Sequence, residues 1–171
     1  DTKIVLDVAA INARHKRVDA LIDEAVRLPS DWTLVIVGAP EEPALLDHAR
    51  NVLGARFVHL RLRRDEMPLV YAAADVFAHA AREEGFGLGI VEAMAAGLPV
   101  VVHCTDHFAW LVGDPGQLVD VDVPGALASG VASAQADVGR RNIERAESFD
   151  WSALAPRYVE MFRTAQAGVR P

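Results

Sequence analysis

Short apolar runs alternate along this chain with segments of helical periodicity, and this alternation limits the possible folds more than any other feature. The runs are continuous stretches rich in Val and Ile. They predict strands at 3–8, 32–37, 56–60, 75–79 and 98–103, and a weaker strand at 117–121. Buried strands separated by helices are typical of a parallel sheet that is covered on both faces. The sequence therefore predicts a doubly wound, Rossmann-like α/β domain with about six parallel strands and helices on both faces.

Amphipathic segments fill the intervals between these strands. The first contains Val18, Leu21 and Ile22 at helical spacing, and Gly54 follows the second in the position of a C-terminal cap. The spacing predicts a helix that begins near Val18 and is ended by Pro29 and Ser30, and helices over 43–53 and 66–73. Further helices are predicted from the glycine-rich segment to about 96, over much of 124–136 and 139–147, and from about 151 to 165. With 171 residues, the chain has the size of one domain with a good core.

Charge and composition exclude several function classes. Lys and Arg number 17 and Asp and Glu 24, which gives a net charge of −7 and argues against non-specific nucleic-acid binding. No apolar run approaches the roughly 20 residues of a membrane span, and no signal segment opens the chain. A single cysteine, Cys104, excludes an internal disulfide and fits a reducing compartment. We therefore expect a cytoplasmic protein. Since the chain begins at Asp1, just before a strand, we expect an excised domain or a processed product.

Ligands of doubly wound sheets bind beyond the carboxyl ends of the strands, where the strand order reverses. The segments that follow the first four strands are 12–16, 38–41, 61–65 and 80–88. They contain most of two basic clusters, residues 14–17 and the three arginines Arg61, Arg63 and Arg64. An ordinary solvated surface is the alternative for each cluster, but their place at the ligand edge favours an anion site.

The segment from Glu84 to Glu92 carries the strongest signal for a ligand. Glycines at 85, 87 and 89 form a turn that opens a helix, where free N–H groups and the positive end of the helix dipole favour an anion. The two carboxylates can face a common crevice and accept bonds from sugar hydroxyls. A tight turn without a ligand is the alternative, and Glu92 could merely complement the dipole. The combination nevertheless favours a nucleotide-sugar.

These residues also resemble a known family. The pattern over 84–101 is similar to the Glu-x7-Glu motif of family 4 glycosyltransferases, retaining enzymes of the GT-B fold. Residues 71–77 resemble the segment that precedes the motif in that family, and 149–151 with the following helix resemble its closing helix. The resemblance covers nearly the whole chain. It implies the C-terminal, donor-binding domain of a glycosyltransferase over 1–171, whose N-terminal acceptor-binding domain is absent.

The resemblance also implies roles for individual residues. Glu84 would bond the transferred hexose, and Lys16 would contact the diphosphate of a UDP or GDP sugar, so we assign both to catalysis. Glu92 would accept both ribose hydroxyls. The turn that would hold the sugar and the diphosphate consists of Gly85, Phe86, Gly87, Leu88 and Gly89. No metal or other cofactor is expected, since Lys16 and the helix terminus supply the positive charge.

One position departs from the family pattern. Ala10 stands where the family usually carries an arginine, six residues before the lysine, as a second phosphate clamp. Arg14, Arg61 or Arg63 would have to supply the missing charge, and we favour Arg14. Contacts to the base are expected around Gly38 and 61–65.

Three other functions stay open. The lost arginine is compatible with a non-catalytic, nucleotide-sugar-binding or regulatory relative. A GT-B nucleotide-sugar epimerase would share the fold, and a pure interaction domain would bind no nucleotide. Because a GT-B enzyme needs two domains, we expect the isolated chain to bind nucleotide with little or no turnover. Any contact with a membrane would involve mainly the absent domain.

Overall fold

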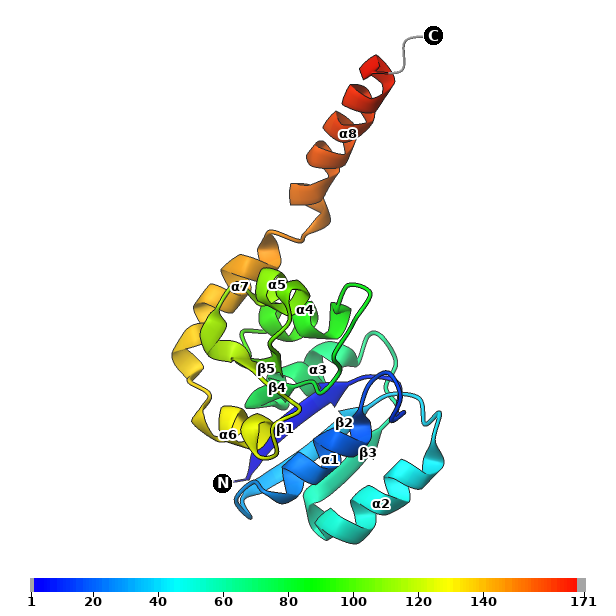
Figure 1. Ribbon diagram of the computed structural model, residues 1–171, viewed down its shortest axis with the longest axis vertical. Coiled ribbons are helices and arrows are strands. Elements are labelled where there is room, and N and C mark those ends of the chain that lie inside the picture. The colour runs from blue at the N-terminus through cyan, green and yellow to red at the C-terminus, as the bar shows by residue number, and fades with distance from the viewer. Residues whose placement is uncertain (1, 169–171) are drawn as a thin grey trace.

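A computed structural model describes residues 2–168 and has one six-stranded sheet at its centre (Figure 1). The strand order is β3-β2-β1-β4-β5-β6, and every neighbouring pair is parallel. The strands are β1 (Lys3–Val8), β2 (Trp32–Val37), β3 (Phe57–Leu60), β4 (Val76–Ala78), β5 (Val100–His103) and β6 (Leu118–Val119). This sheet confirms the doubly wound, Rossmann-like fold that the alternating pattern predicts.

Helices cover both faces of the sheet because successive strand residues point to opposite sides. The helices are α1 (Val18–Val26), α2 (Pro43–Leu53), α3 (Met67–Ala73), α4 (Leu88–Ala95), α5 (Asp106–Val112), α6 (Ala126–Ser133), α7 (Gly139–Glu147) and α8 (Trp151–Gly168). Short 3-10 turns lie at Gly54–Arg56, Pro115–Gln117 and Ala136–Val138. Val5 of β1 packs in a core with α1, α2 and α6. Its neighbour Leu6 packs in a second core with α3, α4, α5 and α7.

The order of the strands reverses between β1 and β4. From β1 the chain builds outward through β2 to β3, and from β4 it builds the other way through β5 to β6. The loops that leave the carboxyl ends of β1 and β4 therefore diverge, and a crevice opens between them. Residues 9–17 and 79–87 border this crevice.

Several strands are shorter than predicted, β6 most of all, and two helices differ more clearly from the prediction. Helix α5 was not predicted. Thr105 caps it, since its side-chain oxygen accepts a hydrogen bond from the Phe108 N–H at 3.3 Å. The signal was there: a capping threonine followed by buried Phe108, Leu111 and Val112 at helical spacing. Helix α8 extends to Gly168, beyond the predicted end at about 165.

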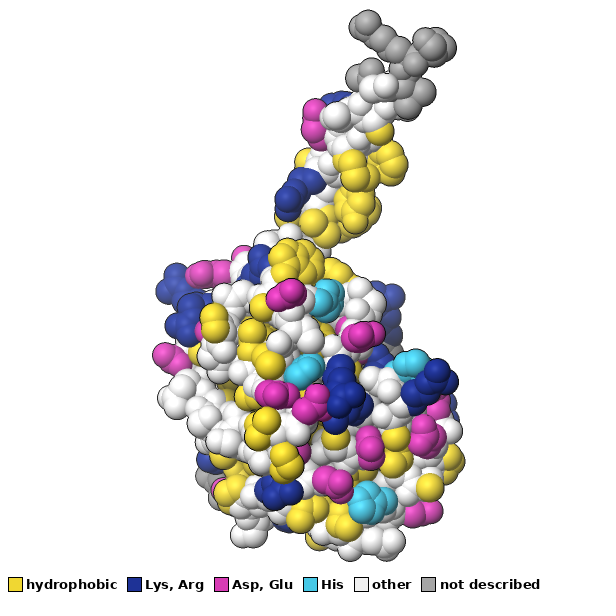
Figure 2. Space-filling view, viewed as in Figure 1, with side chains coloured by type: hydrophobic (Ala, Val, Ile, Leu, Met, Phe, Trp, Pro, Cys, Tyr) yellow, Lys and Arg dark blue, Asp and Glu magenta, His cyan; other side chains and the backbone are white. Residues whose placement is uncertain are grey.

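Helix α8 projects away from the rest of the domain (Figure 1). Figure 2 shows hydrophobic side chains gathered along one side of it, and the exposed ones include Trp151, Met161 and Phe162. Among the described residues, no helix combines the length and the apolarity needed to cross a bilayer.

Candidate functional site

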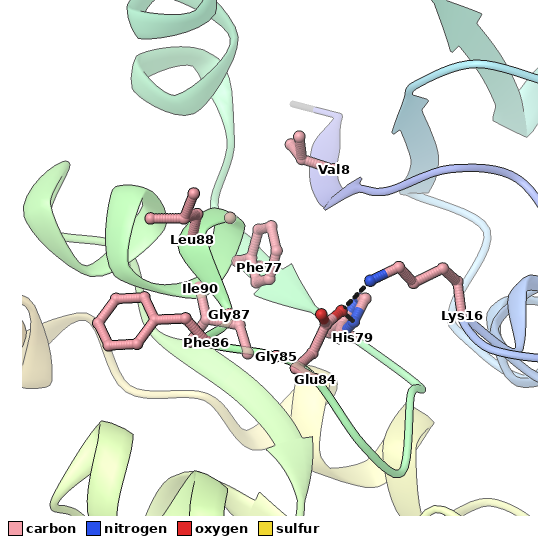
Figure 3. Close-up of a pocket in the computed structure, with 11 residues that line it drawn as sticks. Val8, Lys16, Phe77, His79, Glu84, Gly85, Phe86, Gly87, Leu88 and Ile90 are labelled. Carbon is pink, nitrogen blue, oxygen red and sulfur yellow. Dashed lines mark hydrogen bonds and ion pairs between the residues drawn. The ribbon is translucent and has the colours of Figure 1, made fainter.

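A cavity of ≈ 290 Å³ lies at the point where the strand order reverses (Figure 3). It is lined by the end of β1, the end of β4 and the start of α4. Its lining residues are Val8, Lys16, Phe77, His79 and all of 84–90. The cavity thus brings together both residues that were predicted to be catalytic, Lys16 and Glu84, and the entire glycine-rich turn.

The structural need for glycine differs among the three glycine positions of the turn. Gly87 is the N-cap of α4 and has a φ of 92°, a left-handed conformation that favours glycine. A Cβ on Gly89 would lie 3.1 Å from the carbonyl oxygen of Val8, so glycine lets the start of α4 approach β1 closely. Gly85 has open space around it, so no contact within the chain requires glycine there.

The start of α4 offers unpaired N–H groups to the cavity. The N-cap Gly87 provides no side-chain bond. Within residues 2–168, no hydrogen bond uses the amide N–H groups of 85–89, whereas those of Ile90 and Val91 both donate to the Gly87 carbonyl. Free amides at a helix start attract anions, with the helix dipole adding to the effect.

Glu84 accepts bonds from two nitrogen side chains at a single oxygen (Figure 3). Lys16 Nζ forms an ion pair with Glu84 Oε1, and His79 Nε2 lies 2.8 Å from the same oxygen. The hydrogen bond from His79, followed by the bond from Lys16, outweighs the effect of burial and lowers the pKa of Glu84 to about 2. Glu84 is thus ionised at neutral pH.

His79 and Asp7 complete this cluster, and the sequence reasoning missed both. His79 Nδ1 lies 2.8 Å from Asp7 Oδ1, and the side chains are 3% and 0% exposed. Burial lowers the pKa of His79, but the charge of Asp7 and the hydrogen bonds to Asp7 and Glu84 outweigh it and raise that pKa to about 9. The available signal was a charged residue inside an apolar strand, since Asp7 interrupts the run from Ile4 to Val8.

The loop after β1 is built to hold Lys16 in place. Asn12 Oδ1 accepts bonds from the N–H groups of His15 and Lys16, both at 2.9 Å. Asn12 Nδ2 donates to Glu41 at 2.8 Å, which ties the loop to the segment after β2. The next residue, Arg17, has a φ of 51° and is the only non-glycine residue with positive φ in the described part of the chain. Such an uncommon conformation fits a tightly specified loop.

Glu92 lines a different cavity from Glu84, next to it, and the expectation that both carboxylates face a common crevice stays a prediction. The Tyr71 hydroxyl donates to Glu92 Oε2 at 2.7 Å, which draws the carboxylate towards α3. Burial and this bond raise the pKa of Tyr71. Glu92 lines a broader cavity of ≈ 900 Å³ with Arg64, and Leu88 borders both cavities. The two carboxylates therefore flank the start of α4 on neighbouring sites.

The other predicted donor-binding residues lie at the same edge of the sheet but outside these two cavities. Arg14 and Arg61 are exposed and line neither one. Arg63 pairs with Asp65 at 2.9 Å. Close packing of the backbone requires glycine at position 38, since a Cβ on Gly38 would lie 1.8 Å from the Ala9 carbonyl oxygen. A role for Arg14, Arg61 or Gly38 in binding stays a prediction.

One group of residues in the described chain has a geometry that could hold a metal ion. Ligand atoms of His103, Cys104 and Asp120, near the carboxyl ends of β5 and β6, lie within 4.8 Å of one another, and the cysteine and aspartate are exposed. None of the three lines the Glu84 cavity, where the carboxylate already binds two nitrogen groups. The prediction that this cavity works without a metal is unaffected.

The fold and the site define a Rossmann-like domain with a helix start that presents free amide groups, and with a fixed carboxylate, where the strand order reverses. The family model described as "Glycosyl transferases group 1" matches residues 2–137. The chain therefore belongs to the group 1 glycosyl transferases.

Individual relatives agree with this assignment. The chain is 32% identical over 168 residues to a D-inositol 3-phosphate glycosyltransferase of Corynebacterium glutamicum, which covers 89% of this chain and 40% of that protein. It is 32% identical over 165 residues to a phosphatidyl-myo-inositol mannosyltransferase of Mycolicibacterium smegmatis, covering 88% and 42%. The chain thus spans less than half the length of these curated relatives.

Solved structures show the same architecture. HepE of Anabaena, solved in complex with UDP and glucose, has a TM-score of 0.83 and 25% identity, covering 95% of this chain and 48% of that one. The sucrose-phosphate synthase of Thermosynechococcus elongatus also has a TM-score of 0.83 and 25% identity, covering 98% and 46%.

Proposed function

We propose that this chain is the donor-binding domain of a retaining glycosyltransferase of the GT-B type. The full protein would transfer a hexosyl group from a nucleoside-diphosphate sugar to an acceptor hydroxyl. A second domain, N-terminal to this one, would bind the acceptor and close over the sugar. The chain's coverage of less than half of its relatives supports such a division of labour.

The observation that carries the proposal is the set of unpaired amides at 85–89, which open into the same cavity as Lys16 and Glu84. Amides and an ammonium group together suit a diphosphate, because both donate to anionic oxygens and neither needs a metal. A carboxylate beside them suits sugar hydroxyls. The relative solved with UDP and glucose supports this pairing of ligand chemistries.

The proposed catalysis rests on charge that develops in the leaving group. As the glycosidic bond breaks, negative charge grows on the diphosphate, so the helix start and Lys16 bind the transition state more tightly than the substrate. Lys16 must then turn from Glu84 to the phosphate. No group in the cavity lining is placed as an activated nucleophile, since Glu84 is held by two cations. This agrees with front-side displacement and retention of configuration.

Glu92 would hold the ribose. Its carboxylate can accept two hydroxyls, and the bond from Tyr71 leaves Oε1 to do so. Leu88 borders both cavities, so one extended ligand can lie across the start of α4 with its sugar near Glu84 and its ribose near Glu92.

Calorimetric titration of the chain with UDP, UDP-glucose, GDP and GDP-mannose tests the proposal. We expect one nucleotide and its sugar to bind in the micromolar range, with no added metal. Affinity no better than millimolar for all four would contradict an autonomous donor site and would favour an interaction domain.

Two variants separate the assigned roles. Glu92→Ala should weaken the nucleotide and the nucleotide-sugar alike, by about tenfold, because both carry the ribose. Glu84→Ala should weaken only the sugar-bearing ligand. His48→Gln is the matched control, because His48 is exposed and pairs with Asp23 away from both cavities. Unchanged affinities in both glutamate variants would refute the role assignment.

The replacement of the usual clamp arginine by Ala10 favours one further candidate, a non-catalytic relative that binds the same ligand. Ala10 lines an open cavity together with Lys16 and contributes no charge to it. Joining the chain to its N-terminal domain decides between the two: hexosyl transfer supports the enzyme, and binding without turnover supports the non-catalytic relative.

A further inference from the structure

The buried pair formed by Asp7 and His79 has no role in the function proposed so far. Asp7 lies in the central strand β1 and His79 directly after β4, so the pair bridges the two strands at which the order reverses. Both side chains are almost completely buried, yet His79 reaches the lining of the cavity. Charged groups are rarely buried like this without a reason beyond packing.

The geometry favours a doubly protonated His79 ring. Each of its ring nitrogens lies 2.8 Å from a carboxylate oxygen, Nδ1 from Asp7 Oδ1 and Nε2 from Glu84 Oε1. Between two ionised carboxylates, which only accept hydrogen bonds, both nitrogens donate and the ring is an imidazolium, in agreement with the raised pKa of His79. Asp7 Oδ2 is buried and finds no partner in the described part of the chain, which makes His79 the main compensation for the charge of Asp7.

The charges of the whole cluster then balance. Asp7 and Glu84 are negative, and His79 and Lys16 are positive. The Tyr71 hydroxyl of α3 is the nearby neutral group, whose pKa is raised by burial, by the bond to Glu92 and, least, by the charge of Asp7. The ring of Phe77 stacks on His79 with centroids 6.3 Å apart. With a neutral His79, the cluster would carry an excess negative charge beside the helix start, where an anion is expected to bind.

We propose that Asp7 and His79 act as a positioning pair for Glu84: Asp7 orients the imidazolium, whose Nε2–H holds the Glu84 carboxylate in place when Lys16 turns to a bound anion. Neither residue touches the reacting atoms. Their effect reaches the ligand through Glu84, whose Oε2 has no partner among residues 2–168 and stays available for a hydroxyl. This role rests on the proposed donor site, but the pair itself can be tested without any ligand.

The primary experiment is an NMR titration of the ligand-free chain, with the imidazole nitrogens of His79 and the side-chain carboxyl carbon of Glu84 as probes. We expect His79 to carry both ring protons at pH 7.5 and to lose one only near pH 9. In Asp7→Asn, which keeps the shape and the hydrogen bond, the pKa of His79 should fall towards its ordinary value. In His79→Gln, which keeps a donor but no charge, the pKa of Glu84 should rise.

A neutral His79 at pH 7.5 in the wild-type chain would overturn the proposal. So would a Glu84 carboxyl that titrates identically in wild type and His79→Gln. His48→Gln is the control, because it removes another histidine from a carboxylate pair, but an exposed one. A structural role of His79 alone would change stability without moving the titration of Glu84, so the spectroscopic result separates the two.

A second measurement links the pair to the ligand. We expect both proteins to bind UDP more weakly at pH 9.5 than at pH 7, and the decrease to be about tenfold larger in wild type than in His79→Gln. The reason is that only the wild type loses the positive charge of His79 over this pH range. The ionisation of the uracil ring is common to both proteins and cancels. If no variant binds UDP at any pH, the donor-site proposal fails, and the NMR titration still decides whether Asp7 and His79 position Glu84.

Discussion

The two carboxylates that flank the start of α4 have the same chemistry but lie in opposite kinds of surroundings. Glu84 belongs to a cluster of four charges, with Lys16 and His79 on one oxygen and Asp7 behind the histidine. Glu92 is held by one neutral donor, the Tyr71 hydroxyl. The first site is fixed by charge balance over two strands, and the second by a single hydrogen bond to a neighbouring helix.

This difference indicates how the two sites should respond to change. A buried ionic cluster is sensitive to the loss of any member, because the remaining charges are left unpaired. A carboxylate held by a neutral hydroxyl loses little more than one hydrogen bond. We therefore expect substitutions in the Glu84 cluster to change stability and its pH dependence strongly. Substitutions around Glu92 should change ligand affinity by small factors.

The largest effect should come from His79→Leu, which leaves Asp7 buried without its partner. We expect a loss of about 3–5 kcal/mol in the free energy of unfolding, measured by urea denaturation. The double variant Asp7→Leu/His79→Leu should recover much of that loss, because it removes both charges. A single-variant loss below about 1 kcal/mol would mean that the pair does not contribute as a unit.

The pH dependence of stability sharpens the same contrast. The folded-state pKa of His79, about 9, lies above its ordinary 6.5. Its contribution to the free energy of unfolding is therefore complete below pH 6.5 and disappears as the pH rises through 9. The folded-state pKa of Glu84, about 2, lies below its ordinary 4.5, so its contribution disappears as the pH falls from 4.5 towards 2. Melting temperatures from pH 3 to 10 should fall at both ends. In His79→Gln the alkaline fall should be much reduced, and an unchanged alkaline fall would assign it to other groups.

The fold, the helix start at Gly87 and its two flanking carboxylates could be predicted from the sequence, because their signals are local. The alternation of apolar runs predicts the sheet, and the spacing of Glu84, Gly87 and Glu92 predicts a helix that begins with free amides. Lys16 followed from the resemblance to a family. Each of these inferences needs only residues that are close in sequence or belong to one motif.

The rest of the site depends on contacts between distant segments. Asp7 and His79 are 72 positions apart and meet only because β1 and β4 are neighbours in the sheet. Asp7 alone looks like a polar residue at a strand, and His79 alone looks like a histidine after one. The contact between Tyr71 and Glu92 was missed for the same reason, since Tyr71 lies 21 positions before the carboxylate that it orients.

Gly87 lies between the two carboxylates and sets their relative placement, so substituting it tests both sites together. Gly87→Ala forces a Cβ into a φ of 92° and to 2.9 Å from Leu111 Cδ2. We expect a loss of about 2 kcal/mol in the free energy of unfolding and weaker UDP binding. Gly85→Ala is the control, because it has open space and no positive φ, and should leave stability within about 0.5 kcal/mol. Equal losses in both variants would refute the distinction between these glycines.

The smallest effect should come from Tyr71→Phe, which removes only the hydroxyl that holds Glu92. Because the residue is only 3% exposed and its ring keeps its packing, the loss in the free energy of unfolding should be about 1 kcal/mol. UDP and UDP-glucose should weaken by the same factor, a few-fold at most, because both carry the ribose and the sugar lies near Glu84. Calorimetry on the variant measures both ligands under one set of conditions. If only UDP-glucose weakened, Tyr71 would act on the sugar side, and the two carboxylates would share one site after all.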